Sequence, residues 1–180
     1  MILSTYGSAT PLLNIEDLRA IAGWAAHCAE KALPVLEANA PADERPRAAV
    51  MAARDFALTG TRTGHLRKIA WAANAAAREI GDPAAAAAAR SASAAAGSAY
   101  THPIATPHQT THILASAAYA AEAIARRAID EAGTREAELR RAIERAPASV
   151  RQIVTRFPAR LPSKARFHML LYRLDAGLRL

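Results

Sequence analysis

The chain of 180 residues contains one cysteine, Cys28, so no disulfide can form within it. A single free thiol is typical of proteins in a reducing compartment. The first fourteen residues hold no basic stretch followed by an apolar core, so we predict no secretory signal there. Together these absences favour a cytoplasmic protein.

Charged side chains are missing from a long stretch in the middle of the sequence. No Asp, Glu, Lys or Arg occurs between Ser91 and Ala121. A membrane helix needs about 20 strongly apolar residues, whereas this stretch holds two prolines, three histidines and a glutamine among weakly hydrophobic alanines. We therefore predict no membrane segment.

Several sequence motifs of enzymes are also missing. The chain has no glycine-rich phosphate loop, no Gly-x-Ser-x-Gly elbow and no cysteine pair suited to zinc. The corresponding enzyme classes are disfavoured, and we predict no cofactor and no metal. Whether the chain is catalytic stays open at this stage.

Alanine, the best helix former, makes up about a quarter of the residues, while aromatic residues are 5%. This composition predicts an all-α fold, either an irregular bundle or stacked αα-hairpins of about seven or eight helices. We expect one helical domain over residues 1–180. Its neutral body would be 14–133, with basic C-terminal helices, 134–180, packed on it.

Capping residues, prolines and glycines predict where these helices begin and end. Pro34 should kink or break the first helix near Leu33. Pro107 should open the fifth helix, and Gly133 should end it. The expected helices are 15–39, 47–58, 63–80, 84–100, 107–132, 134–146, 147–157 and one that follows Ser163 and reaches at least Leu174.

The excess of positive charge lies in the last quarter of the chain. Residues 134–180 hold eleven basic and four acidic side chains, whereas residues 1–133 are balanced, and 20 of the 23 basic residues are arginine. Guanidinium groups favour planar anions, so this tail could contact nucleic acid, an acidic protein surface or an anionic ligand. A solvated helix face is the favoured explanation. Nucleic acid is the least favoured partner, because the chain has no recognised DNA-binding motif and few aromatic residues.

A group of histidines is the strongest indication of a binding site. If Pro107 opens a helix, one stripe of that helix carries His108, His112, Ala115, Tyr119 and Glu122. We expect these groups and the preceding His102 to converge on a shared interior space. His108, His112 and Tyr119 are the candidates for acid/base chemistry. Helix capping and core hydrogen bonds are the equally weighted alternative, and metal binding is disfavoured.

Two further pairs, Trp24 with His27 and Trp71 with Asn74, could wall an aromatic pocket. Core packing is the favoured role of both tryptophans. Cys28 lies among alanines, so we expect it to be buried and unreactive.

A cluster of opposite charges surrounds the loop after the first helix. We expect Glu30 to meet Asp43, Arg45 and Arg47 if this loop folds back along the helix. Such pairs can fix a loop in place, and this architectural role is favoured over ligand contact.

The same part of the chain resembles a known family. The residues that carry the resemblance are Cys28-Ala29-Glu30, Glu37, the segment Asp43 to Ala49 with its Arg-Pro-Arg, and Gly60. They are similar to those of the bacterial helical family of putative immunity proteins. Looser similarity extends through Ala70 to Glu79, through Tyr100 to Tyr119, and to the C-terminal end.

The resemblance implies an all-helical protein that neutralises a partner, such as a cognate toxin, by occluding it. Because this chain is basic, such a partner is expected to be acidic or neutral. The alternative is an enzyme or ligand carrier of bacterial specialised metabolism, with a His/Tyr-lined pocket for a small molecule between helices. The candidate ligand-binding residues are Trp24, His27, Glu30, His102, His108, His112, Tyr119 and Glu122.

Overall fold

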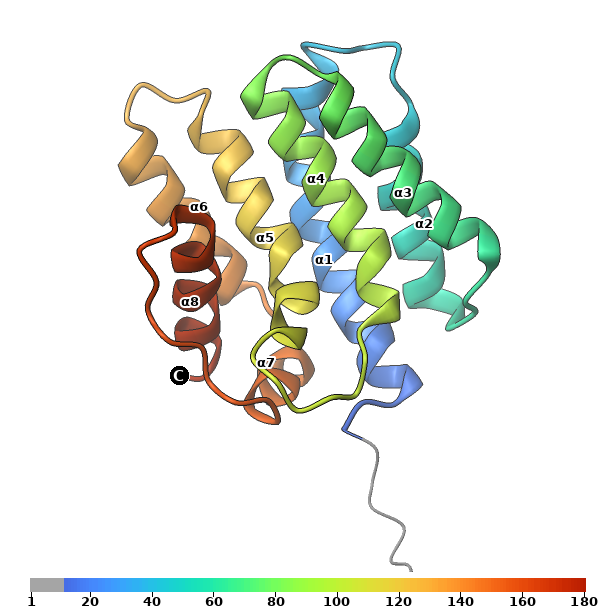
Figure 1. Cartoon of the computed structure of the whole chain (residues 1–180), viewed down its shortest axis with the longest axis vertical. Helices are drawn as coiled ribbons and strands as arrows, with labels where there is room; N and C mark the ends of the chain where they lie inside the picture. Colours follow the sequence, from blue (N-terminus) through green and yellow to red (C-terminus); the bar gives the residue numbers. More distant parts are fainter. Residues whose placement is uncertain (1–11) are drawn as a thin grey trace, which may run out of the picture.

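Figure 1 shows the computed structural model of the protein, which describes residues 12–180. This part of the chain is all-helical, as predicted, and contains no strand. Its elements are α1 (Ile15–Glu37), α2 (Arg45–Thr59), α3 (Gly64–Glu79), α4 (Pro83–Gly97), the short 3-10 helix η1 (Ser98–Tyr100), α5 (Gln109–Ala125), α6 (Glu131–Glu144), α7 (Ala148–Thr155) and α8 (Arg166–Leu178).

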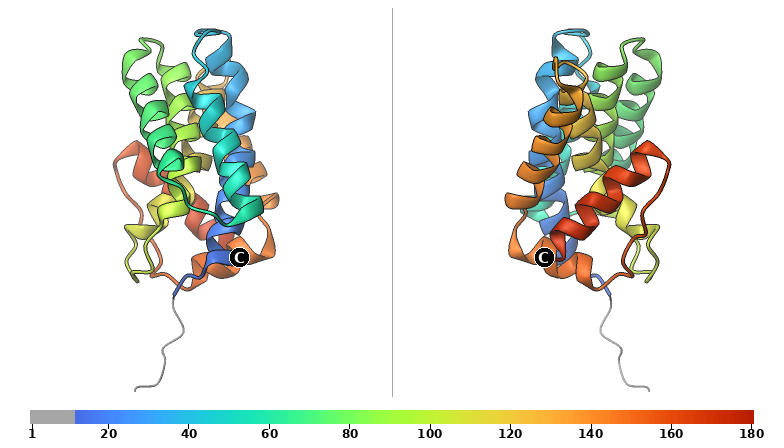
Figure 2. Two further views of the ribbon diagram at one scale, coloured as in Figure 1. Left: turned by 90° about the vertical axis from the view of Figure 1, so that its right-hand side faces the viewer. Right: turned by 90° about the vertical axis from the view of Figure 1, so that its left-hand side faces the viewer.

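The longest helix, α1, lies at the centre of the molecule. It packs against α2, α4 and α5, and the views in Figures 1 and 2 show it behind the last two. On one side α3 packs on α2 and α4, while on the other α6 and α8 pack on α5. The short α7 crosses below and contacts α1 and α8.

Side-chain caps explain half of the α-helix starts, those of α1, α3, α4 and α6. Asn14 and Asp17 form a capping box at α1, with the Asp17 amide donating to Asn14 Oδ1 at 2.9 Å and the Asn14 amide to Asp17 Oδ2 at 3.0 Å. Thr63 caps α3 and Asp82 caps α4 through a single hydrogen bond each, accepted by the side chain from the amide three residues on. At the other end, Gly60 closes α2 with φ of 70°, a left-handed conformation that favours glycine.

The prediction for the fifth and sixth helices was wrong in its boundaries. Pro107 does not open a helix, since α5 begins at Gln109, and α5 ends at Ala125 rather than at Ala132. The next helix starts at Glu131, where Asp130 accepts a hydrogen bond from the Gly133 amide at 2.9 Å. Gly133 is therefore a first-turn residue of α6, and an aspartate cap three residues upstream decides the boundary.

Pro34 does not break α1, which continues to Glu37. Proline removes one amide donor from the hydrogen-bond ladder. Here it lies within the last turn, and the Ala38 amide still donates to the Pro34 carbonyl at 3.1 Å. The bond that Pro34 removes is the one to the Glu30 carbonyl one turn before it, and only three residues of α1 follow the proline.

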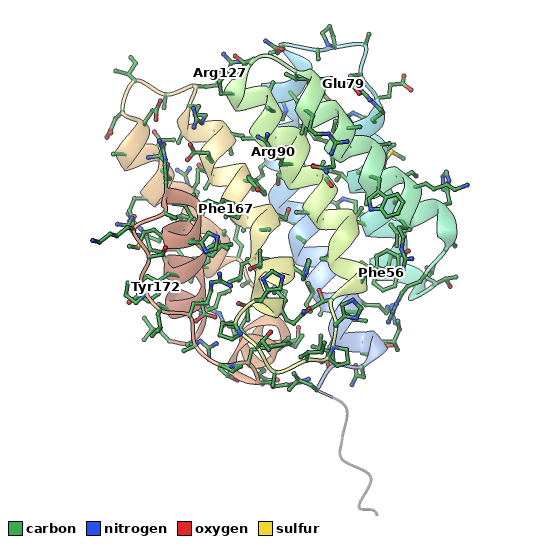
Figure 3. All side chains as sticks on the ribbon, viewed as in Figure 1. Phe56, Glu79, Arg90, Arg127, Phe167 and Tyr172 are labelled. Atoms are coloured by element: carbon green, nitrogen blue, oxygen red, sulfur yellow. The ribbon has the colours of Figure 1, made fainter. Side chains whose placement is uncertain are left out.

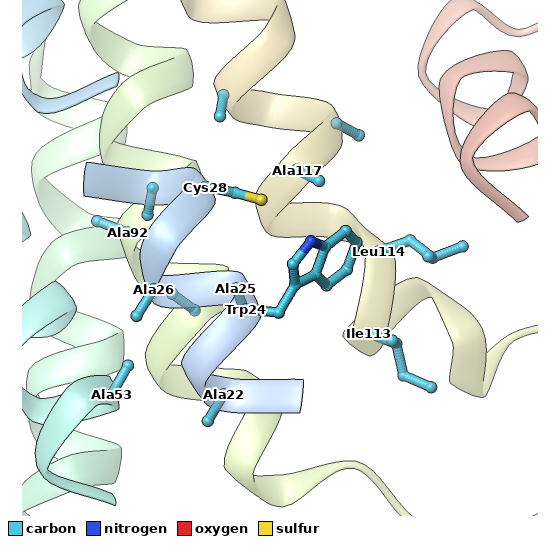
Figure 4. Close-up of a cluster of buried hydrophobic side chains, with 14 of the residues drawn as sticks. Ala22, Trp24, Ala25, Ala26, Cys28, Ala53, Ala92, Ile113, Leu114 and Ala117 are labelled. Carbon is cyan, nitrogen blue, oxygen red and sulfur yellow. The ribbon is translucent and has the colours of Figure 1, made fainter. Parts of the chain in front are cut away.

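The core between α1, α4 and α5 is built from small side chains. Figure 4 shows alanines of α1 beside Ala53 of α2 and Ala92 of α4, while Trp24 and Cys28 lie on the side of α1 that meets α5. Small residues let helix backbones approach closely. Two buried hydroxyls add polar links: Ser91 Oγ donates to the Ser116 carbonyl at 2.7 Å, and Ser116 Oγ donates to the Ala25 carbonyl at 2.8 Å.

The C-terminal helices bury larger apolar residues. Apolar residues at helical spacing lie inside, at Val150, Ile153, Val154 and Phe157 and at Leu170, Leu171 and Leu174, whereas Phe167 on the same stripe is only partly buried. Gly177 marks a close approach of α8 to α6, because a Cβ there would lie 2.4 Å from Ile143 Cδ1. Within residues 12–180 no helix is long and apolar enough to span a bilayer.

Candidate functional site

The outer face of α3, α4 and α5 carries two grooves placed end to end. Successive turns of α4 line them: Ala86, Ala87 and Arg90 line one groove, and Ser93, Ala94 and Gly97 line the other. Because most of these residues are small, the larger side chains of the neighbouring helices stand above them. Figure 3 shows this face, with Arg90 near its centre and Phe167 of α8 at one side.

The first groove, here the aromatic groove, is defined by Arg67, Trp71, Tyr100, His102 and His112 and has a volume of about 610 Å³. The indole of Trp71 is 68% exposed. The Arg67 guanidinium lies 4.5 Å from the centre of the Tyr100 ring, a cation–π contact. The Tyr100 hydroxyl donates to the Thr63 carbonyl at 2.9 Å, which fixes the ring. Trp71 is thus a surface residue, and the favoured core role predicted for it was wrong.

The histidines do not converge on an interior space, contrary to our expectation. His102, His108 and His112 are all exposed, and only His102 and His112 line the aromatic groove. The rings of His108 and His112 meet edge to face with 5.8 Å between their centres. Partial burial, with smaller effects of His108 and His102, lowers the pKa of His112, which favours the neutral imidazole. No three His, Cys, Asp or Glu side chains in residues 12–180 come together as metal ligands.

The second groove, here the arginine groove, is defined by Arg78, Arg90, Tyr119, Arg126, Arg166 and Phe167 and has a volume of about 580 Å³. It lies between α3 and α4 on one side and α5 and α8 on the other. The rings of Tyr119 and Phe167 are stacked, with centres 4.3 Å apart. Burial raises the pKa of Tyr119. The structure therefore separates Tyr119 from His112, although both lie on the predicted stripe of α5.

Glu122 is the carboxylate of the arginine groove, and it is 8% exposed. Its oxygens bind Arg126 Nε at 2.8 Å, Arg135 Nε at 2.7 Å and an Arg166 nitrogen at 3.0 Å. Burial alone would raise its pKa, but the hydrogen bond from Arg135 and the three positive charges leave the pKa below its usual value. Glu122 thus joins α5, α6 and α8, and its lone pairs are already occupied.

Trp24 and His27, the other predicted pair, lie at the seam between α1, α5 and α6. Trp24 is buried, and its indole nitrogen donates to the Ala142 carbonyl at 3.1 Å, so its core role is confirmed. His27 and Cys28 border a cavity of about 20 Å³, which has room for about one water molecule. Burial raises the pKa of the Cys28 thiol to about 12, in agreement with an unreactive residue.

The predicted cluster of charges after α1 is only partly brought together. Arg45 binds both oxygens of Asp43, at 2.9 and 2.8 Å, and also Glu79 at 2.6 Å. The hydrogen bond from Arg45 lowers the pKa of Asp43. Arg47 and Glu30 lie outside this cluster: Arg47 pairs with Glu37, and Glu30 pairs with Arg54 of α2. The helix that follows the loop, rather than the loop itself, supplies the partner of Glu30.

Most arginines of the basic tail have a partner within the molecule, although six of the ten are exposed to solvent, as the favoured explanation expects. In the described part of the chain, Arg160 donates to the Pro107 carbonyl at 2.6 Å and to the hydroxyl of Thr110 at 2.9 Å, which holds the loop before α5. Arg156 binds Asp17 at 2.6 Å. The other tail arginines with partners are Arg135, Arg141, Arg151, Arg166, Arg173 and Arg179.

Sequence reasoning missed Arg67, Tyr100, Arg78 and Arg90 as groove residues. Arg90 is the last charge before the uncharged stretch, and that position on an alanine-rich helix was a usable signal. Arg67 and Arg78 share one face of α3 with Trp71 and Asn74, at spacings of four, three and four residues, so helical periodicity was a usable signal for them as well. Tyr100 comes from η1 and meets Arg67 only through packing.

Comparison with protein families gives a match over residues 12–149, about three quarters of the chain, to the model described as Imm-5 like putative immunity protein. The match runs from the start of α1 into α7 and includes both walls of the aromatic groove. Searches of curated proteins and of solved structures gave no match. With its all-helical fold and the resemblance around Cys28 and Gly60, the chain belongs to the family of Imm-5 like putative immunity proteins.

Proposed function

We propose that this protein binds a partner protein, a toxin encoded beside its gene, and neutralises it by covering the surface on which that toxin acts. The family supports a protein partner and an immunity-like role. The proposed place of action is the cytoplasm of the cell that makes the toxin. This mode of action needs a stable complex and no chemistry by the immunity protein itself.

The observation that carries the proposal is the exposed aromatic groove within the family-matched part of the chain. Tryptophan, tyrosine and arginine are the residues that contribute most to binding energy at protein interfaces. Here Trp71, Tyr100 and Arg67 stand together on one face, and the contact of Arg67 with Tyr100 holds two of them in place. A prearranged group of this kind loses little side-chain entropy on binding.

The shape of this face also supports occlusion. The aromatic groove and the arginine groove lie on successive turns of α4 on the same face, so one protein surface can cover both. Trp71 is 68% exposed and lies in one groove with Tyr100 and Arg67, so a partner can cover these three side chains together. Contact with a partner would remove this indole from water.

Co-expression tests the proposal directly. The toxin gene is expressed with the wild-type protein, with Trp71→Ala, or with Leu58→Ala. Leu58 is a matched control, because it is also exposed (75%) but lies on α2, outside the aromatic groove. We expect wild type and Leu58→Ala to restore growth, while Trp71→Ala weakens binding of the purified toxin by about 30-fold, a typical loss at an interface hot spot.

The result that overturns the proposal is the absence of both binding and protection by the wild-type protein with each neighbouring gene product. Equal protection by wild type and Trp71→Ala would instead remove the aromatic groove from the interface. Circular dichroism melting of each variant shows whether it is folded.

A further inference from the structure

We propose that the arginine groove receives an acidic segment of the partner protein, one that combines carboxylates with an apolar or aromatic side chain. This inference rests on the proposed function and specifies which chemistry the partner presents. It concerns a surface that contains none of the exposed aromatic residues of the aromatic groove.

The charges of the groove carry the first step. Four guanidinium groups line it, from Arg78, Arg90, Arg126 and Arg166, against the single carboxylate of Glu122. Glu122 already binds the last two. Within residues 12–180, neither Arg78 nor Arg90 has a carboxylate within ion-pair distance. The groove thus presents two free cations on its α3 and α4 side, and a third and fourth that are only partly neutralised.

The position of the two free arginines strengthens the preference for carboxylates. They project from adjacent antiparallel helices, α3 and α4, toward the same hollow. Guanidinium groups bind carboxylates through two parallel hydrogen bonds, and such pairs are stronger where water is partly excluded. A segment with two acidic residues can therefore engage Arg78 and Arg90 together.

The floor of the groove carries the second step. Between the arginines lie the small side chains of Ala86 and Ala87, and on the α5 and α8 side lie the stacked rings of Tyr119 and Phe167 with Leu170. This apolar surface gains free energy when an apolar side chain covers it. A highly charged segment without such a side chain would leave this apolar surface exposed to water. The structure therefore favours a partner segment that contains both acidic and apolar residues.

The size of the groove agrees with a short peptide segment. Its volume of about 580 Å³ lies in the range of sites that hold several side chains or a drug-sized molecule. The aromatic groove lies beside it, on the next turns of α4. One partner can therefore place an aromatic-contacting surface on Trp71 and an acidic segment on Arg90.

The test measures the dissociation constant of the purified complex with the neighbouring toxin by isothermal titration calorimetry. The variants are Arg78→Glu, Arg90→Glu, their combination, and Arg140→Glu as control. Arg140 is an exposed arginine of α6 that lines neither groove, so it carries the same charge change away from the proposed site. Melting temperatures establish that all variants are folded.

We expect each groove variant to weaken the complex about tenfold or more and the double variant at least 100-fold, while Arg140→Glu stays within about threefold. Raising the NaCl concentration should weaken the wild-type complex but strengthen that of the double variant, because salt screens the attraction in the first and the repulsion in the second. Equal affinity of the double variant and wild type overturns the inference and leaves the proposed function standing. Absence of any complex with wild type overturns the proposed function.

A further measurement distinguishes binding of a protein segment in the arginine groove from binding of a small anion there. Inorganic phosphate at 10 mM is titrated into the wild-type protein, and the toxin is then titrated in the presence and absence of phosphate. We expect weak phosphate binding and little change in toxin affinity. Tight phosphate binding with no effect of Arg78→Glu or Arg90→Glu on the toxin would overturn the inference in favour of a small-molecule site.

Discussion

The helices α1–α5 and the helices α6–α8 are held together by different means. In the first region, fully buried alanines such as Ala88 and Ala118 let α1, α4 and α5 approach closely, with the Ser91 and Ser116 hydroxyls as polar links. In the second, leucine, valine and isoleucine stripes are combined with arginines that bind carboxylates and carbonyls of the first region. The helices α1–α5 thus depend on close packing of small side chains, whereas α6–α8 combine apolar packing with ion pairs.

This difference predicts different sensitivities. Close packing of small residues has no room for extra atoms, since interiors are packed as densely as crystals. Arginine side chains are long and flexible, so their contacts tolerate small changes in the distance between helices. These contacts depend on the charge of the partner, so loss of charge on a carboxylate that several arginines share removes several contacts at once. The free energy of unfolding should therefore be most sensitive to an increase in side-chain volume in α1–α5, and to the loss of a charge or a change of pH in α6–α8.

The largest effect is expected from Ala88→Leu in α4. Ala88 is 0% exposed and belongs to the helix that packs on α1, α3 and α5. The larger side chain would force these helices apart, at a cost of about 3 kcal/mol in the free energy of unfolding. Urea denaturation followed by circular dichroism measures the loss.

Ala132→Leu is the matched control, because Ala132 is exposed in the first turn of α6. Its change should stay within about 0.5 kcal/mol. Similar midpoints for the two variants would show that the α4 interface can relax and that the first region does not depend on close fit.

A smaller effect is expected from Glu122→Gln, which tests the second region. The substitution keeps the shape but removes the charge that Arg126, Arg135 and Arg166 share. The expected loss is about 2 kcal/mol, less than for a fully buried pair because Arg126 and Arg166 are partly exposed to solvent. The control is Glu136→Gln, whose pair with Arg173 is about half exposed on both sides, and whose effect should be near zero.

The pH dependence of the same variant gives a second readout. The folded pKa of Glu122 lies below the value of 4.5 expected in the unfolded chain. Its charge therefore stabilises the fold above about pH 4.5, and this contribution is lost as pH falls through the lower, folded pKa. The melting temperatures of wild type and Glu122→Gln should thus converge on acidification. A constant difference down to about pH 3 would show that the charge of Glu122 is not what matters.

The all-helical class and most helix starts could be predicted, because capping residues and prolines act locally. Asn14, Thr63 and Asp82 each accept a hydrogen bond from an amide three residues on, and that spacing is visible in the sequence. The boundary between α5 and α6 was mispredicted because two residues, Asp130 and Gly133, each fit a helix end. Asp130 fits the start of α6 and Gly133 fits the end of α5, and tertiary packing decides which of the two sets the boundary.

The candidate site was predicted less well than the fold. The stripe of His112, Tyr119 and Glu122 does share one face of α5, as helical spacing requires. What covers that face was not visible, since α4 and α8 come from distant segments, and they divide the stripe between two grooves. Whether either groove binds a partner stays a prediction.

The smallest effect is expected at Cys28, whose thiol faces the seam between the two regions. Its neighbours there include Ala121 of α5 and Ala142 of α6, so labelling requires that α6 move away from α1 and α5. We expect very slow reaction of the native thiol with a disulfide reagent at pH 8, since burial raises its pKa to about 12.

Glu122→Gln should speed labelling of Cys28 about tenfold, whereas Glu136→Gln should not. If the C-terminal helices open alone, the labelling rate should depend only weakly on urea, because a local opening exposes little surface. A urea dependence as steep as that of global unfolding would mean that α1–α5 and α6–α8 unfold as one unit. The two regions would then differ in the kind of contacts that hold them, but not in their free energy of unfolding.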